Sequence, residues 1–167
     1  QKDTAGAAAN EATARLLLGP EYFEALQESY RGRLSSIRDL PGRITMNPGQ
    51  AVWRAWVLAL SGYASEARIA GMDAGKMAKS MLDRGNSALT LARTGDAAGA
   101  QKLAADLNRQ YPEATWVRFC FLPMLRATLA LREGRSQEAL EALAAASPYE
   151  KIDLKVAYLR GEAYLAA

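Results

Sequence analysis

The chain has 167 residues, half of them hydrophobic, and its 21 basic and 18 acidic side chains give a net charge of +3. This length suffices for one ordinary domain with an apolar core. The two signs of charge are interspersed without a basic stripe, which argues against a nucleic-acid-binding face. With no histidine and a single cysteine, Cys120, histidine-based catalytic triads and Cys/His zinc sites are excluded.

The N-terminal part is expected to be a lead-in to the main fold. Residues 1–19 are small and polar for much of their length, and we expect them to be partly disordered with one short helix at the end. Pro20 suits the first position of a longer helix, in which apolar residues recur at spacings of three and four up to about Asp39. Pro41-Gly42 ends that helix. Residues 20–47 are therefore expected to form an N-terminal helix and a loop.

From Pro48 onwards the sequence predicts helices joined by short loops. Asp96, Ser136 and Asp153 suit N-cap positions. The predicted helices span 48–61, 64–77, 81–93, 97–111, 115–133, 137–146 and 154 to the end of the chain. Pro123 lies inside the fifth of these, so that segment is either one kinked helix or two short ones. No region alternates apolar and polar residues for long, so no strand is expected.

Small residues recur along these helices at a common phase. Gly62, Gly95 and Gly134 follow one another at intervals of 33 and 39 residues. Each glycine has an alanine seven residues before it and another five residues after it, which gives the pairs Ala55 and Ala67, Ala88 and Ala100, and Ala127 and Ala139. A period in the thirties with small residues at fixed phase is typical of stacked helical hairpins.

This pattern resembles the tetratricopeptide repeat (TPR), a 34-residue helical hairpin. The resemblance implies an all-α fold, a right-handed superhelix of antiparallel helical hairpins. In such a hairpin the two alanines face each other where the helices cross, and the glycine permits the tight turn. We expect one domain over 1–167. Its repeat hairpins are predicted over 48–80, 81–114 and 115–150, with a truncated final repeat helix over 151–167, and the longer second interval places about five extra residues around 115–122.

A narrower resemblance covers residues 22–167. The segments 88–96, 107–112, 122–127 and 158–165 are similar to the repeat region that follows the catalytic domain in some bacterial eukaryotic-type Ser/Thr protein kinases. Related regions follow winged-helix regulators. The resemblance implies a non-catalytic part of a larger signalling protein, since the kinase motifs themselves are absent here. Its location stays open: cytoplasmic, or extracytoplasmic if a membrane span precedes it in the parent protein.

In this repeat family the first helix of each hairpin lines a concave groove. Carried over to this chain, the groove positions are Trp56, Leu89, Arg93, Phe121, Met124, Thr128, Leu131, Arg132, Lys155, Tyr158 and Glu162. The resemblance implies an apolar floor with basic edges, which suits a peptide or a partner domain. For Trp56, Phe121 and Leu131 the alternative is simple packing between helices, and for Arg93, Arg132 and Lys155 it is an ordinary solvated face.

We therefore expect a protein–protein interaction scaffold and not an enzyme. No cofactor, metal or nucleic acid is expected, and the apolar stretches are too short to span a membrane. The partner is a protein or peptide, and self-association is left open. The alternative is a ligand-sensing module that controls an attached kinase or DNA-binding domain; it requires an enclosed pocket with convergent polar groups.

Overall fold

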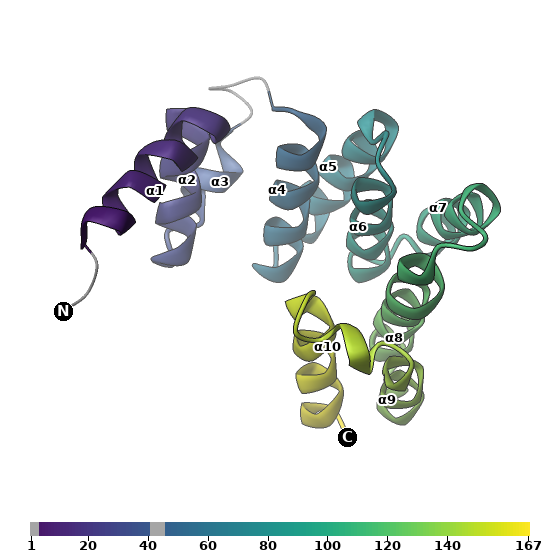
Figure 1. The fold of residues 1–167 in the computed structure, drawn as a ribbon. Helices are drawn as coiled ribbons and strands as arrows, with labels where there is room; N and C mark the ends of the chain where they lie inside the picture. The colour runs from purple at the N-terminus through teal and green to yellow at the C-terminus, as the bar shows by residue number, and fades with distance from the viewer. Residues whose placement is uncertain (1–3, 41–45) are drawn as a thin grey trace. The chain divides into compact units, whose positions relative to one another are not determined.

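The computed structural model describes residues 4–40 and 46–167, and all regular secondary structure in these residues is helical (Figure 1). The all-α fold class is therefore confirmed. By its contacts the chain divides into two compact units, Gln1–Asn47 and Pro48–Ala167. The sequence predicts one domain, and the start of its first predicted repeat hairpin, at residue 48, coincides with the start of the second unit.

The first unit contains α1 (Thr4–Leu18), α2 (Pro20–Tyr30) and the short α3 (Ser35–Arg38). Helix α1 begins at Thr4, earlier than the short helix expected at the end of residues 1–19, because the alanine-rich segment has high intrinsic helix propensity; residues 1–3 lie outside the described residues. Arg15 joins α1 to α2, with Nη1 3.1 Å from Glu24 Oε1 and the guanidinium 5.1 Å from the centre of the Phe23 ring.

The prediction of one helix from Pro20 to about Asp39 is wrong, because α2 ends at Tyr30. Gly32 adopts a φ of 82°. Its N–H donates to Ser29 O at 3.0 Å, and the N–H of Arg33 donates to Glu28 O at 2.9 Å, which together form a Schellman motif. The apolar residues keep their helical spacing on both sides of Gly32, so their pattern did not indicate that the helix ends there. The predicted break at Pro41-Gly42 lies outside the described residues.

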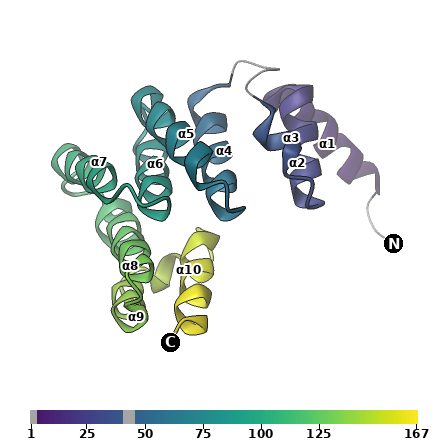
Figure 2. The ribbon, with the colours of Figure 1, turned by 180° about the vertical axis from the view of Figure 1, so that it is seen from behind.

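The second unit consists of three helical hairpins and a final helix. Its elements are α4 (Pro48–Leu60), α5 (Ala64–Met77), α6 (Met81–Arg93), α7 (Ala97–Gln110), the π-helical segment η2 (Val117–Phe121), α8 (Leu122–Arg132), α9 (Ser136–Ala144), the 3₁₀ turn η3 (Ser147–Tyr149) and α10 (Leu154–Leu165). Helix α4 packs on α5, α6 on α7 and α8 on α9, and α10 packs on α8 and α9. Figures 1 and 2 both show α10 beneath α4.

Each hairpin turn is closed by a glycine in the left-handed region. The φ angles are 84° at Gly62, 91° at Gly95 and 72° at Gly134. In each turn the N–H of the next residue donates to the carbonyl five residues before it, at 3.0 Å for Tyr63 to Leu58, 2.9 Å for Asp96 to Leu91 and 2.9 Å for Arg135 to Ala130. The common phase of these glycines therefore corresponds to three left-handed turns closed by the same backbone hydrogen bond.

Side-chain caps begin two of the helices as predicted. Asp96 Oδ1 accepts from the Gly99 N–H at 2.9 Å, and Asp153 Oδ1 accepts from the Lys155 N–H at 3.0 Å. The predicted cap at Ser136 is wrong. Helix α9 already includes this residue, and Arg135 precedes it without a side-chain capping bond.

The alanine pairs that flank these glycines are buried. Ala55, Ala67, Ala100, Ala127 and Ala139 are 0% exposed and Ala88 is 3% exposed. The last two pairs belong to one apolar cluster with residues of α6 to α10. Because alanine projects a single methyl group, buried alanines at these positions allow paired helices to pack closely.

The extra residues of the longer interval form a π-helical segment ahead of Pro123. The N–H of Leu122 donates to Val117 O, which is the i to i−5 pattern of a π-helix. Proline has no N–H to donate, and here it falls in the first turn of α8, where none is needed. The helical path therefore continues through the proline. Phe121 lies against Gly85, where an added Cβ would come within 2.8 Å of the ring.

We expect a larger side chain at a helix crossing to destabilise the fold. Ala100→Leu should lower the free energy of unfolding by about 2 kcal/mol, because the buried site has no room for the added atoms. Ala105→Leu, at an exposed position of the same helix, should change it by less than about 0.5 kcal/mol. Urea denaturation measures both. Equal midpoints for the two variants would contradict close packing at Ala100.

Alanine substitution of two exposed glycines should have opposite effects. Gly134→Ala should destabilise by about 1 kcal/mol, because φ is 72° there. Gly161→Ala, inside α10 with open space around the added Cβ, should stabilise by about 0.5–1 kcal/mol through helix propensity. Thermal unfolding of both variants shows whether each substitution lowers or raises the melting temperature. A stabilising Gly134→Ala would show that the left-handed turn is not required.

Candidate functional site

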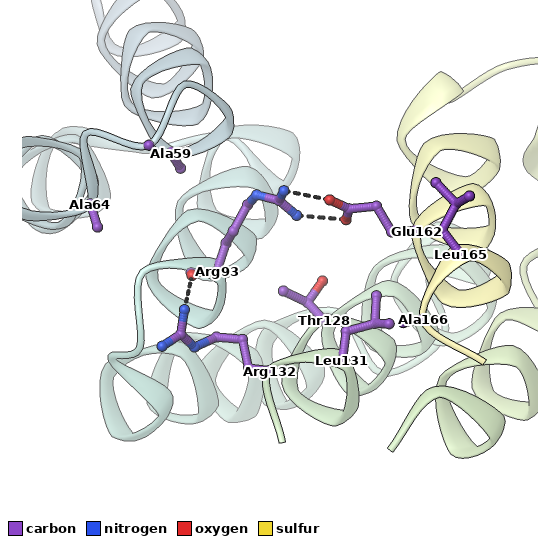
Figure 3. A pocket seen from close by; sticks show the side chains of 10 residues that line it. Ala59, Ala64, Arg93, Thr128, Leu131, Arg132, Glu162, Leu165 and Ala166 are labelled. Atoms are coloured by element: carbon purple, nitrogen blue, oxygen red, sulfur yellow. Dashed lines mark hydrogen bonds and ion pairs between the residues drawn. The ribbon is translucent and has the colours of Figure 1, made fainter. Parts of the chain in front are cut away.

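A cavity of about 550 Å³ lies among the first helices of successive hairpins (Figure 3). Its lining residues are Ala59 of α4, Gly62 and Ala64 at the turn into α5, Arg93 of α6, Thr128, Leu131 and Arg132 of α8, and Glu162, Leu165 and Ala166 in and after α10. The lining is mostly small or aliphatic, with three charged side chains. We call this the basic cavity.

A bidentate ion pair between α6 and α10 forms one wall of the basic cavity. Arg93 Nη1 donates to Glu162 Oε2 at 2.7 Å, and Arg93 Nη2 donates to Glu162 Oε1 at 2.6 Å. Figure 3 shows the two groups facing each other. The side chains are 19% and 29% exposed, so water competes only partly with the pair. Such fork-like pairs have strong geometric preference, and this one fixes α10 relative to α6.

Two aromatic side chains complete the surroundings of Arg93. Its guanidinium carbon lies 5.9 Å from the centre of the Trp56 ring and 5.5 Å from that of Tyr158. The Tyr158 hydroxyl donates to Glu162 Oε1 at 3.0 Å. Both ring distances are within the range of cation–π attraction. Arg93 thus ties together α4, α6 and α10, three helices that are far apart in the sequence.

The ion pair shifts the titration of both partners. Burial by itself would raise the pKa of Glu162, but the hydrogen bonds and charge of Arg93 outweigh it and leave the pKa below its ordinary value of 4.5. The hydrogen bonds to Glu162 raise the pKa of Arg93 against the effect of burial. Both side chains are therefore charged at neutral pH, and Glu162 neutralises Arg93.

Arg132 is the second cation of the basic cavity and has no acidic partner in the part of the chain that the structure describes. Its Nη1 donates to the backbone oxygen of Arg93 at 2.8 Å, as Figure 3 shows. The residue is exposed. Because Glu162 is already engaged by Arg93, the cavity has one unmatched positive charge, at Arg132. An anionic group that enters it would find donors there.

Most of the predicted groove residues gather at this place. Arg93, Thr128, Leu131, Arg132 and Glu162 line the basic cavity, and Trp56 and Tyr158 surround Arg93. These positions come from four successive first helices, and the structure brings them together around one cavity.

The other predicted groove residues lie elsewhere. Leu89, Phe121 and Met124 are 1%, 3% and 0% exposed and belong to the apolar core, so packing describes them better than contact with a partner. Phe121 and Lys155 border a different cavity, and the Lys155 Nζ lies 2.8 Å from Asp153 Oδ1.

Sequence reasoning missed several lining residues of the basic cavity. Ala59, Gly62 and Ala64 lie at the first hairpin turn, and Leu165 and Ala166 lie at the end of α10. Their side chains carry no chemistry that would single them out. The only available signal was the position of Gly62 at a predicted turn, which does not reveal a cavity.

The described residues contain no constellation for metal binding or thiol chemistry. In residues 4–40 and 46–167, no three Cys, Asp or Glu side chains gather as metal ligands would. Cys120 is buried, and burial raises its thiol pKa to about 12; the thiol is therefore protonated at neutral pH and a poor nucleophile. None of the described helices has the length and apolar character required of a membrane-crossing segment.

Comparisons of the chain with protein-family models, with curated proteins and with solved structures give no match.

Loss of the Glu162 charge should produce a pH-dependent loss of stability. The pKa of Glu162 is lower in the folded chain than in the unfolded chain. The ionised carboxylate therefore makes its full contribution to the free energy of unfolding above about pH 4.5, and that contribution is lost as the pH falls through the folded pKa. The difference in free energy of unfolding between the natural chain and Glu162→Gln should therefore be largest near neutral pH and shrink in acid. Denaturation at several pH values measures it.

Glu66→Gln is the matched control, because Glu66 is exposed on α5. Its free energy of unfolding should differ little from that of the natural chain at every pH. If Glu162→Gln behaves like this control, the ion pair does not hold α10 against α6.

Proposed function

We propose that this chain is a protein–protein interaction scaffold, with TPR-like helical hairpins arranged as a right-handed superhelix. It is the non-catalytic repeat region of a larger bacterial signalling protein, and it binds a peptide or partner domain on its concave side. The supporting observation is that the first helices of successive hairpins, α4, α6 and α8, together with α10, contribute side chains to one cavity. A surface built from consecutive hairpins is the usual binding surface of repeat proteins.

The chemistry of the basic cavity favours an acidic segment with an apolar neighbour. Arg132 supplies the unmatched positive charge, and Leu131 and Leu165 supply aliphatic surface. Arg93 is unsuited to capture a partner's acid, because Glu162 already occupies its fork. The expected partner therefore places an Asp or Glu side chain, or a C-terminal carboxylate, on Arg132 and an apolar side chain beside it.

The ligand-sensing module is the second candidate, and one observation favours it. Thr128, Arg132 and Glu162 line one hollow of about 550 Å³, which is within the usual size range of small-molecule sites, although it is open to solvent and not enclosed. A small carboxylic acid that raised the melting temperature in proportion to the logarithm of its concentration would favour this reading. Binding that needs several residues of a peptide would favour the scaffold.

The scaffold proposal predicts a charge-dependent peptide preference. Peptides selected from a random library against the intact chain should carry an acidic residue next to a large apolar one. Arg132→Glu should weaken their binding by about tenfold or more, because a favourable charge pair is replaced by a repulsive one. Arg126→Glu, the same change at an exposed position of the same helix, should leave binding nearly unchanged. Isothermal titration gives the affinities.

Salt provides an independent check, since the interaction at an exposed Arg132 should weaken as ionic strength rises. Thermal unfolding of both variants establishes that they are folded. Equal loss of binding in Arg126→Glu and Arg132→Glu would assign the effect to net charge. Selected peptides without acidic residues would remove Arg132 from the binding site.

A further inference from the structure

The charged side chains that line the basic cavity add up to a single positive charge. Arg93 and Arg132 are its cations, and Glu162 is its carboxylate. Both oxygens of Glu162 accept from the Arg93 guanidinium, at 2.7 Å and 2.6 Å, and Oε1 also accepts from the Tyr158 hydroxyl at 3.0 Å. Arg132 is therefore the one lining charge that is left for a ligand, and the carboxylate of Glu162 is what limits the number to one.

Glu162 is within reach of a ligand in the basic cavity. Its side chain is 29% exposed and that of Arg93 is 19% exposed. Figure 3 shows both side chains on the wall of the hollow that Arg132 also lines. A ligand held by Arg132 lies in the same hollow as the Glu162 carboxylate, and partial burial of the ion pair reduces the screening of its charges by water.

One unmatched cation suits a ligand with one negative charge. The attraction between a ligand and a fixed cation rises in proportion to the charge of the ligand, whereas the cost of removing the ligand from water rises with the square of that charge. The second charge of a dianion would also lie near Glu162 without a counter-charge, and like charges in a partly desolvated site repel each other. A phosphate dianion is therefore at a disadvantage relative to a carboxylate.

We propose that Glu162 is the specificity-determining residue of the basic cavity, and that its charge makes the cavity select carboxylates over phosphate dianions. This selection rests on the proposed function, in which Arg132 takes an acidic group of the partner. Without the charge of Glu162, the same cavity would contain two unmatched guanidinium groups, which are the preferred protein groups for binding phosphate. An acidic partner segment is thus accepted through Asp, Glu or a C-terminal carboxylate, and a phosphorylated segment is bound more weakly.

Two small anions with the same alkyl group test this selection. 4-Methylpentanoate has one negative charge, and 3-methylbutyl phosphate has two at about pH 8 and mostly one at about pH 5.5, since its second pKa is about 6. The chain has no histidine, so its side-chain charges change little between these two conditions. Glu162 in particular stays ionised, because its pKa lies below its ordinary value of 4.5. NMR signals of the Arg93 and Arg132 side-chain N–H groups follow binding to the intact chain.

The natural chain should bind the phosphate ester about fivefold more weakly than the carboxylate at the higher pH, and this difference should disappear at the lower pH. Glu162→Gln should strengthen binding of the ester by about tenfold at the higher pH, and that of the carboxylate by less, because a second guanidinium becomes available. Glu162→Asp retains the charge and should retain the preference of the natural chain. Glu141→Gln, the same loss of charge at an exposed position of α9, should leave both affinities unchanged.

Thermal unfolding establishes that each variant is folded, and the comparison of the two pH values in the natural chain needs no substitution. Equal affinity of the natural chain for both anions at the higher pH would overturn the proposal. An unchanged preference in Glu162→Gln, or no binding of either anion to that variant, would also overturn it.

Arg132→Glu distinguishes failure of this proposal from failure of the proposed function. If Arg132→Glu leaves carboxylate binding unchanged, the basic cavity does not take an acid through Arg132, and both proposals fail. If Arg132→Glu abolishes carboxylate binding while Glu162→Gln leaves the preference unchanged, only the role of Glu162 is wrong.

Discussion

Close packing of paired helices is the constraint on which the second unit depends. The alanines that flank each turn glycine are almost fully buried, so neighbouring backbones can approach without larger side chains between them. The left-handed glycines then reverse the chain within a few residues. Because three hairpins share this geometry, their first helices follow one another along one side. That succession makes a cavity lined by four helices possible.

The Arg93–Glu162 pair has a different role from the one expected of a groove residue. Its distances and partial burial describe an internal connection between α6 and α10, supported by the rings of Trp56 and Tyr158. This connection forms one wall of the basic cavity. Arg132 differs from Arg93, because no carboxylate among the described residues balances its charge. Arg93 is thus a paired cation with a structural role, and Arg132 is an unpaired cation and the candidate for binding.

The two cavities offer complementary chemistry within one unit. The basic cavity presents an unmatched positive charge with small and aliphatic side chains, whereas a second cavity of about 740 Å³, at the starts of α6 and α10, presents the exposed aliphatic side chains of Leu82, Ile152 and Leu154. A partner that used both would gain affinity from linked contacts without a large single interface.

The sequence by itself determined the helices, their turns and the positions of closest packing, because these follow from local rules: glycine at a left-handed turn, alanine at a crossing and aspartate at a cap. The same rules failed at Gly32, where apolar spacing concealed the stop, and at Ser136, where the cap lies one residue earlier. Only the tertiary structure decided which groove residues reach solvent. Leu89, Phe121 and Met124 belong to the same predicted groove set as Arg93, yet they are buried in the apolar cluster that residues of α6 to α10 form. Pairing of Arg93 with Glu162, 69 residues away, depends on how three hairpins stack, which no local pattern encodes.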